Sequence, residues 1–415
     1  MIATNTVAQG DTREVGLDVM VTNGFTITRA IQSRSWPASS ANLEYAAVWG
    51  TVETVPEDLP RVADGADVRR ISTLLEPVGR VAGLPSRLAE NAGISFIGSI
   101  VNGVGFTMPP EVASEMLAED DAANRVIFPY LTGEDTNSRP DASASRYVVD
   151  FTGMSQAEAM HWRRPFAWVE EHVRPHRSTL TNKPKQQEEW WLYERPGPAM
   201  RRAIAGLPEV LVIARVSKTV MPLRVPTGQV VSEACVVFAT DAYGDQAVLS
   251  SSLHQLWAIT YGSGMRNDPR YTPSDVFETF PRPRSAEALE QIGRLLDEKR
   301  RKVMIRRDLG LTKLYNLMND PAVASEADSD VARMRAIHTE LDRAVLAAYG
   351  WSDLSLGHGF HEYRKIVRWT VGPDARTEIL DRLLEENQRR AALESTGRRP
   401  ERRSDAAHES ATLFD

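Results

Sequence analysis

Cysteine is almost absent from this sequence. Its 415 residues contain only one, Cys235, which excludes an internal disulfide framework and a zinc site built from cysteines. Cys235 lies in the apolar run 230–238, where we expect a small buried hydrophobic side chain.

Histidine is also too scattered to suggest a metal centre. His172 and His176 are four residues apart, and His358 and His361 are three apart. Neither pair has an evident third ligand at a suitable spacing, so we expect no metal site.

Long apolar runs are lacking as well. No stretch approaches the roughly 18 apolar residues that a membrane-spanning helix needs. The opening residues, MIATNTVAQGDTRE, have neither the basic region nor the apolar stretch of a secretory signal. We therefore expect a cytoplasmic protein with no membrane partner. Hydrophobic residues make up 42% and charged residues 25% of the chain, which is typical of a globular protein of two or three domains.

Positive charge is not in excess, since the formal net charge is -7. This argues weakly against nonspecific coating of DNA but leaves sequence-specific binding open, because clustered cations create a local field. Clusters occur at 299–302 and 306–307, within one expected helix, and at 389–390. A solvated helix face explains them equally well. Residues 394–415 are rich in Gly, Pro, Ser and charge, and we expect a disordered tail there.

The first 60 residues predict part of a sheet. Ile2–Ala3 look like the end of a strand, and a helix follows from Asp11 or Thr12 to about Val21, stopped by Asn23-Gly24. Two β-prone runs, 25–31 and 43–49, come next. These elements cannot bury their faces alone, so we expect them to form the edge of an α/β sheet.

The rest of the chain predicts an α+β fold. In residues 61–285, short β-prone runs and helical stretches alternate with loops rich in Pro and Gly, where binding residues usually lie. From residue 286 the pattern is helical, with apolar residues at helical spacing in 286–307, 331–349 and 374–393.

Seven strings together carry a family resemblance. They are TNTVAQGDTRE (4–14), SRSWP (33–37), NAGISFIGSIVNGVGF (91–106), FPYLTGEDTNSRPDASASRYVVDF (128–151), VLVIARVSK (210–218), PTGQVVSEACVVF (226–238) and RYTPSDVFETFPRP (270–283). Their order and spacing resemble the downstream part of MmeI-like restriction–modification enzymes and related adenine-specific DNA methyltransferases. The resemblance implies the end of a methyltransferase domain in 1–60, a target recognition domain in 61–285 and a C-terminal helical domain in 286–393.

The family's reaction is methylation of adenine N6 with S-adenosylmethionine, in restriction–modification or phage defence. It needs a Gly-rich cofactor loop and an Asn/Asp-Pro-Pro-Tyr/Phe motif, and neither occurs here. The nearest strings are a Gly-x-Gly at 103–105, which we interpret as a turn, and Met108-Pro109-Pro110-Glu111, which we interpret as a helix start.

The resemblance therefore leaves open whether this chain is itself an enzyme. We expect it to bind double-stranded DNA and to need a catalytic methyltransferase polypeptide in trans. That polypeptide would supply most of the binding site for S-adenosylmethionine, and this chain alone would bind none. The alternative is a DNA-binding remnant or regulator without methyl transfer.

Trp36-Pro37 matches one catalytic-site feature of the related methyltransferases. There, an aromatic residue followed by proline, between the last two strands, stacks against the adenine that is flipped out of the duplex. Trp36 is our candidate for this role, and packing against the domain core is an equal alternative. Arg34 would hold a flanking phosphate, although an exposed loop arginine fits its position as well.

Polar residues around two apolar runs that we expect to be strands, 210–214 and 230–238, form the predicted reading surface. Base edges are read by Arg, Lys, Asn, Gln, Glu and Asp. The candidates are Arg215, Ser217, Lys218, Arg224 and Gln229, with Glu233 inside the second strand. A solvated hairpin is the alternative.

Two loops of hydrogen-bond donors are candidates for clasping the DNA backbone. We prefer the second loop, with Arg266, Asn267, Arg270 and Tyr271. In the first, Asn137-Ser138-Arg139 with Arg146, the nearby acids favour salt bridges to the arginines instead.

Overall fold

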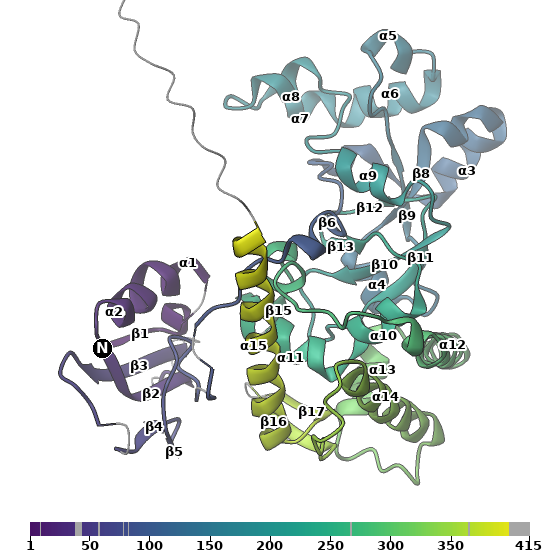
Figure 1. The fold of residues 1–415 in the computed structure, drawn as a ribbon. Helices are drawn as coiled ribbons and strands as arrows, with labels where there is room; N and C mark the ends of the chain where they lie inside the picture. The colour runs from purple at the N-terminus through teal and green to yellow at the C-terminus, as the bar shows by residue number, and fades with distance from the viewer. Residues whose placement is uncertain are drawn as a thin grey trace, which may run out of the picture.

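The computed structural model describes residues 1–8, 10–37, 44–56, 59–77, 79–81, 83–265, 268–363 and 366–397. The fold is mixed α/β, with several sheets and a helical C-terminal region (Figure 1). None of the described helices is long and apolar enough to cross a membrane.

The N-terminal body has the strand, helix and two strands that the sequence predicts. The elements are β1 (Ile2–Thr4), a helical stretch made of α1 (Gly10–Arg13), η2 (Glu14–Asp18) and α2 (Val19–Thr22), β2 (Thr26–Ser35) and β3 (Glu44–Thr51). Asn23 caps α2, and Gly24 has φ +93°, a left-handed conformation that glycine adopts without strain. β3 lies between β1 and β2 and is antiparallel to both.

This body extends beyond the expected limit at residue 60. β4 (Arg61–Ala63) pairs in parallel with β2, and β5 (Ala66–Val68) pairs with β4. Ile71 and Leu75 complete its small core beside Leu17 and Ile27. The sheet order is β1-β3-β2-β4-β5, so the body ends near Leu75.

Two further sheets form the middle of the chain. One has the order β11-β10-β13-β6, with β6 (Ser95–Ile97), β10 (Glu209–Ala214), β11 (Leu223–Pro226) and β13 (Cys235–Phe238). The other has the order β12-β8-β9-β7, with β7 (Thr107–Met108), β8 (Ile127–Leu131), β9 (Arg146–Val149) and β12 (Val230–Val231). Cys235 is fully buried at 0% exposure, as predicted.

The apolar run 230–238 differs from the expected single strand. Val230–Val231 pair with β8, whereas Cys235–Phe238 pair with β10 and β6 in the other sheet. Between them the Ser232 hydroxyl accepts a hydrogen bond from the Ala234 amide at 3.1 Å, which makes a turn. The run therefore joins the two sheets.

Seven of the described helices lie in the middle of the chain. They are α3 (Pro110–Glu119), α4 (Gly133–Ser138), α5 (Gln156–Ala159), α6 (Arg163–His172), α7 (Arg174–Ser178), α8 (Pro184–Glu188) and α9 (Pro198–Ile204). Most of them lie around the second sheet, whereas α4 contacts β10 and α9 contacts β6. α6 and α7 are separate helices because α7 begins at Arg174 with Pro175 in its first turn, where proline is tolerated. Large aromatic side chains, among them Phe166, Trp190 and Tyr193, fill the separate core between this sheet and its helices.

The C-terminal helices share one core with the β10 sheet. They are α10 (Tyr243–Ser250), α11 (Ser252–Tyr261), α12 (Glu290–Arg307), α13 (Leu311–Asn319), α14 (Ser329–Ala348) and α15 (Pro373–Gly397). Val237, Trp257 and Leu341 belong to the same buried cluster. The core therefore has no break at residue 285. A hairpin, β16 (Gly359–Tyr363) and β17 (Ile366–Thr370), precedes α15 and was not predicted.

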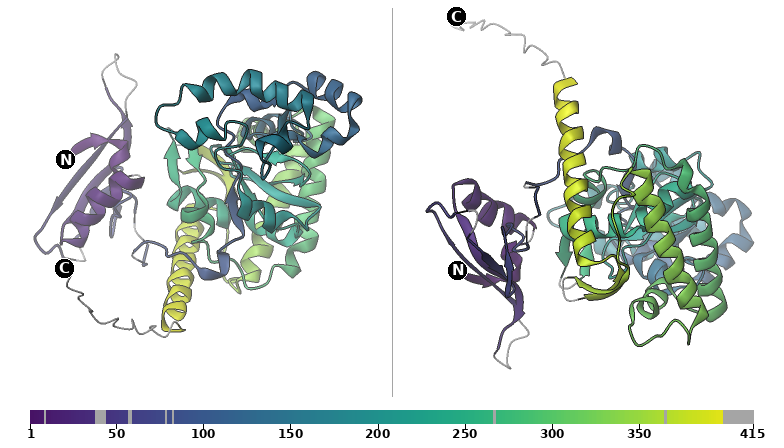
Figure 2. Two further views of the ribbon diagram at one scale, coloured as in Figure 1. Left: turned by 90° about the horizontal axis from the view of Figure 1, so that it is seen from above. Right: turned by 60° about the horizontal axis from the view of Figure 1, so that its bottom comes forward.

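The segment between the N-terminal body and the two middle sheets lies along α15, which stands between them in both Figure 1 and Figure 2. The Asp381 carboxylate accepts hydrogen bonds from the amides of Arg80 (2.9 Å) and Val81 (3.4 Å). A Cβ at Gly79 would lie 2.1 Å from the same carboxylate, so a larger residue there would displace the Asp381 side chain. Residues 79–90, here called the linker, are thus fastened to α15.

More contacts continue this arrangement along the helix. Asn387 accepts from the Ser86 amide at 2.8 Å, and Glu394 accepts from the Ala89 amide at 3.0 Å. α15 reaches residue 397, four residues into the expected tail, and residues 398–415 lie outside the described part.

Candidate nucleic-acid interface

Three segments that are distant in sequence meet at the end of β10. Val216 and Arg270 form an antiparallel bridge, and the Tyr271 amide donates to the Arg215 carbonyl at 2.7 Å. Arg270 belongs to β15 (Asp268–Arg270), which pairs with β14 (Ser263–Met265). The third segment is the end of α4, where the Asn137 Oδ1 accepts from the Ser217 hydroxyl at 3.2 Å. We call Asn137, Arg215–Lys218 and Arg270 the β10-end cluster.

Arg215 is a half-buried cation, and no carboxylate among the described residues is bound to it. Its Nη1 donates to the Glu233 carbonyl at 3.1 Å, and its buried Nε has no hydrogen-bond partner. Burial, then the positive charge of Arg270, lowers the pKa of Arg215, while Glu233 acts in the opposite direction. Because the backbones of these two arginines are neighbours, two positive charges lie on adjacent segments, an arrangement that an anion would stabilise.

The other members of the cluster have different environments. Arg270 is half-buried and forms no ion pair with the described residues. Lys218 is exposed, whereas Ser217 is buried at 8% and also accepts from the Thr219 amide at 3.1 Å. Ser217 therefore fixes the loop, and Arg215, Arg270 and Lys218 supply its charge.

Arg224 and Tyr271 are interior residues, and the prediction that their side chains contact DNA is corrected. Arg224 is 4% exposed, donates to the Asp241 carbonyl at 2.7 Å and lies 3.9 Å from the ring centre of Tyr243. Tyr271 is 3% exposed and its hydroxyl bonds to Nε2 of His254 at 2.9 Å. Both stabilise the shared core instead of facing a ligand.

Gln229 lies at the opposite end of β10 from Arg215. It follows β11, whose last residue Pro226 pairs with Glu209 at the start of β10. Its side-chain amide donates to the Pro226 carbonyl at 2.8 Å. The predicted reading surface is therefore not one continuous face. Arg266 and Asn267 lie outside the described residues.

Arg34 and Trp36 stand apart, in the N-terminal body. Arg34 is exposed and pairs with Tyr45 across β2 and β3. Trp36 is 42% exposed, and its ring meets the Tyr45 ring edge to face, with centroids 5.4 Å apart. A large aromatic face thus remains open to solvent at the end of this hairpin.

In the loop that follows Asn137, Arg139 has the intramolecular partners that the neighbouring acids suggested. Its Nε donates to the Ser143 hydroxyl at 3.0 Å and lies 3.8 Å from the Asp141 carboxylate. Arg146 is exposed on β9. The contact between Asn137 and Ser217 was missed, because no local pattern relates residues 80 positions apart.

The Gly-x-Gly at 103–105 and the Pro-Pro at 109–110 both have structural explanations. A Cβ at Gly105 would lie 2.2 Å from the His172 carbonyl oxygen, so this glycine permits close packing against α6 and does not line a cofactor loop. Pro109 precedes α3 and Pro110 begins it, which confirms the predicted helix start. No group of three or more potential metal ligands occurs within the described part of the chain.

Comparisons with known proteins agree with this architecture. Residues 86–284 match the family model described as the MmeI target recognition domain. The chain is similar to a solved structure of the type IIL restriction–modification enzyme MmeI in complex with DNA, with 16% identity and a TM-score of 0.66. That match covers 94% of this chain and 49% of the other, so this chain spans about half the length of that enzyme. No curated protein sequence matches the chain.

Proposed function

Because residues 86–284 form an MmeI-like target recognition domain, we propose that this chain recognises specific sequences in double-stranded DNA. The observation that carries the proposal is the β10-end cluster. It places Arg215 and Arg270 on neighbouring backbone segments, and among the described residues neither has a carboxylate bound to it. Guanidinium groups arranged in this way favour a phosphate oxyanion.

Within the cluster, backbone contact and base reading have different requirements. Phosphate contacts need positive charge and are independent of sequence, whereas base edges need matched donors and acceptors. We assign Arg215 and Arg270 to phosphates. The exposed Lys218 and the half-buried Glu233 are the side chains suited to base edges, to guanine and cytosine respectively.

The test begins with enrichment of a random duplex library on the full chain, followed by affinity measurements at several salt concentrations. Arg270→Gln should weaken binding to the enriched sequence by about tenfold and reduce the slope of log K against log salt by about 0.9. Arg343→Gln, which removes one exposed charge from α14, is the matched control and should change neither value. A library that yields no preferred sequence, or an Arg270→Gln variant that binds like the unchanged chain, would refute the proposal.

The second part of the proposal is that recognition serves adenine-N6 methylation in a restriction–modification system. The cofactor and the catalytic motif would be supplied by a methyltransferase part that docks on the N-terminal body. Two observations support this. Among the described strands β1 pairs only with β3, so its other edge is free. The neighbouring helical stretch exposes Val15 (78%), Val19 (48%) and Val21 (40%).

The half-exposed Trp36 would then stack against a flipped adenine. A mixture of this chain, a candidate catalytic polypeptide, S-adenosylmethionine and duplex DNA should yield methylated adenine only when both proteins are present. Trp36→Ala should lower methylation more than DNA binding, and equal losses would indicate packing against Tyr45 instead. Specific DNA binding without methylation in the mixture would support a DNA-binding regulator.

A further inference from the structure

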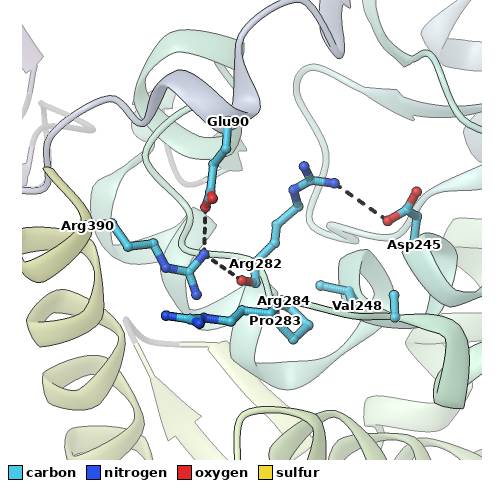
Figure 3. A pocket seen from close by; sticks show the side chains of 8 residues that line it. Glu90, Asp245, Val248, Arg282, Pro283, Arg284 and Arg390 are labelled. Carbon is cyan, nitrogen blue, oxygen red and sulfur yellow. Dashed lines mark hydrogen bonds and ion pairs between the residues drawn. The ribbon is translucent and has the colours of Figure 1, made fainter. Parts of the chain in front are cut away.

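A small polar pocket lies where the linker, α10, the segment after residue 281 and α15 come together (Figure 3). Its volume is about 170 Å³, and the residues that line it are Glu90, Asp245, Val248, Arg282, Pro283, Arg284, Ala286 and Arg390. Three of these are arginines from two distant parts of the sequence. None of them belongs to the β10-end cluster.

Arg282 is fixed in position by bonds that leave part of its guanidinium unused. Its Nε donates to the Asn91 side chain at 2.9 Å, and its Nη1 lies 3.6 Å from the Asp245 carboxylate. Within the described residues, its Nη2 has no hydrogen-bond partner.

Arg390 is fixed in the same manner from α15. Its Nε donates to Glu386 at 2.7 Å, and its Nη1 donates to Glu90 at 2.5 Å and to the Arg282 carbonyl at 2.8 Å. Its Nη2 likewise has no partner in the described part of the chain. The guanidinium groups of Arg282 and Arg390 are thus held in place by other contacts, and the Nη2 group of each can still donate hydrogen bonds.

Arg284 is the third cation, and it differs from the other two. It is exposed and forms no hydrogen bond or ion pair with any described residue. In Figure 3 its side chain extends toward Arg390. The pocket therefore has three positive charges and two negative ones, Glu90 and Asp245, and each carboxylate already faces one of the fixed arginines. One positive charge is left over.

We propose that this pocket binds the oxyanion of a phosphate group, held by Arg284 together with the free Nη2 groups of Arg282 and Arg390. Guanidinium N–H pairs match the geometry of phosphate oxygens, and fixing two of the three groups beforehand reduces the entropy lost on binding. The volume suits one such group and the lining is largely polar. A bound phosphate would tie the linker, the end of the recognition region and α15 together.

The phosphate has two possible sources, a DNA backbone or a free phosphate ion. The first rests on the proposed function and the second does not. The decisive variant is Arg284→Gln, because this exposed side chain supports no other contact and its loss leaves the fold intact. Arg284→Lys keeps the charge without the paired N–H groups, and Arg343→Gln removes an equivalent exposed charge elsewhere.

One arm measures thermal unfolding of the full chain in inorganic phosphate and in chloride at equal ionic strength. Phosphate at about ten times its half-saturating concentration should raise Tm by roughly 1–3 °C. The same rise is expected in Arg343→Gln, none in Arg284→Gln and a smaller rise in Arg284→Lys. This arm remains informative if the chain binds no specific DNA.

The other arm measures the salt dependence of DNA binding. A loss of about 0.9 in the slope for Arg284→Gln, for any sequence, supports a backbone phosphate. An unchanged slope together with phosphate-dependent stabilisation supports a free phosphate ion. If Arg284→Gln matches Arg343→Gln in both arms, the pocket is not a phosphate site.

Discussion

The N-terminal body and the body built around β10 bury their apolar residues to very different extents. Around β10, one core runs from the sheet through α11, α12 and α14 to α15. In the N-terminal body the core is small and contains several alanines beside Leu17 and Ile27, while the helical stretch leaves Val15 and Val19 exposed. The N-terminal body therefore leaves a larger share of its apolar residues exposed than the large body, where exposed ones such as Ile305 are few.

The largest expected effect comes from breaking the shared core. Phe280 is fully buried and packs against Trp257 and His254. Phe280→Ala should lower the free energy of unfolding of the large body by about 3–5 kcal/mol. Hydrogen exchange should then rise together in β10 and α14, because they share one core, while β2 is unaffected. Faster exchange in β10 with no change in α14 would show that the two are separate domains.

A fall in pH should also affect the stability of the two bodies differently. Burial lowers the pKa of His254 and of His338 to about 4, from an ordinary value of 6.5. Below pH 6.5 the unfolded chain binds protons that the folded chain excludes, so stability falls as the pH falls from 6.5 to about 4 and then levels off.

Each histidine accounts for about 1.4 kcal/mol per pH unit in this window, which amounts to roughly 3 kcal/mol for each of the two. Residues 1–75 contain no histidine, so this loss is confined to the large body. Urea unfolding at pH 7, 5.5 and 4 measures it. His254→Gln should remove one histidine's share of the pH dependence, and an undiminished slope would mean that His254 is not the group that titrates.

The smallest effect concerns the linker between the bodies. Asp381→Ala removes the acceptor for the Arg80 and Val81 amides and should lower the free energy of local opening by about 1–3 kcal/mol. Trypsin should then cut faster after Arg80 and Arg87. Asp353→Ala removes an exposed ion pair with Arg382 and serves as the control, with little change in cleavage. Equal cleavage rates in both variants would show that the linker is held by other contacts.

Elements with strong local signals could be predicted from the sequence. The helix ending at Asn23-Gly24 and the start of α3 at Pro109-Pro110 follow from capping and proline geometry alone. The division of 230–238 between two sheets could not be predicted, because it depends on which distant strands, β8 or β10, pair with each half.

The candidate site shows the same limit. Arg215 and Lys218 are polar residues that follow an apolar strand, and the structure places them in one cluster with Arg270. Arg224 has a similar local pattern but is covered by α10 and α12, which come later in the chain. The pocket formed by Arg284 and Arg390 depends on residues more than 100 positions apart, which no local pattern relates.

The fastening of the linker to α15 bears on how target specificity can be transplanted between proteins of this architecture. A graft limited to residues 86–284 would leave Asn387 and Glu394 facing foreign residues in place of Ser86 and Ala89, and would divide the core that α12 and α14 share with β10. The smallest segment that contains both the shared core and the contacts between the linker and α15 runs from residue 79 to residue 397. Shuffling of specificities, whether by recombination or in the laboratory, should therefore succeed with that longer cassette and fail with the shorter one.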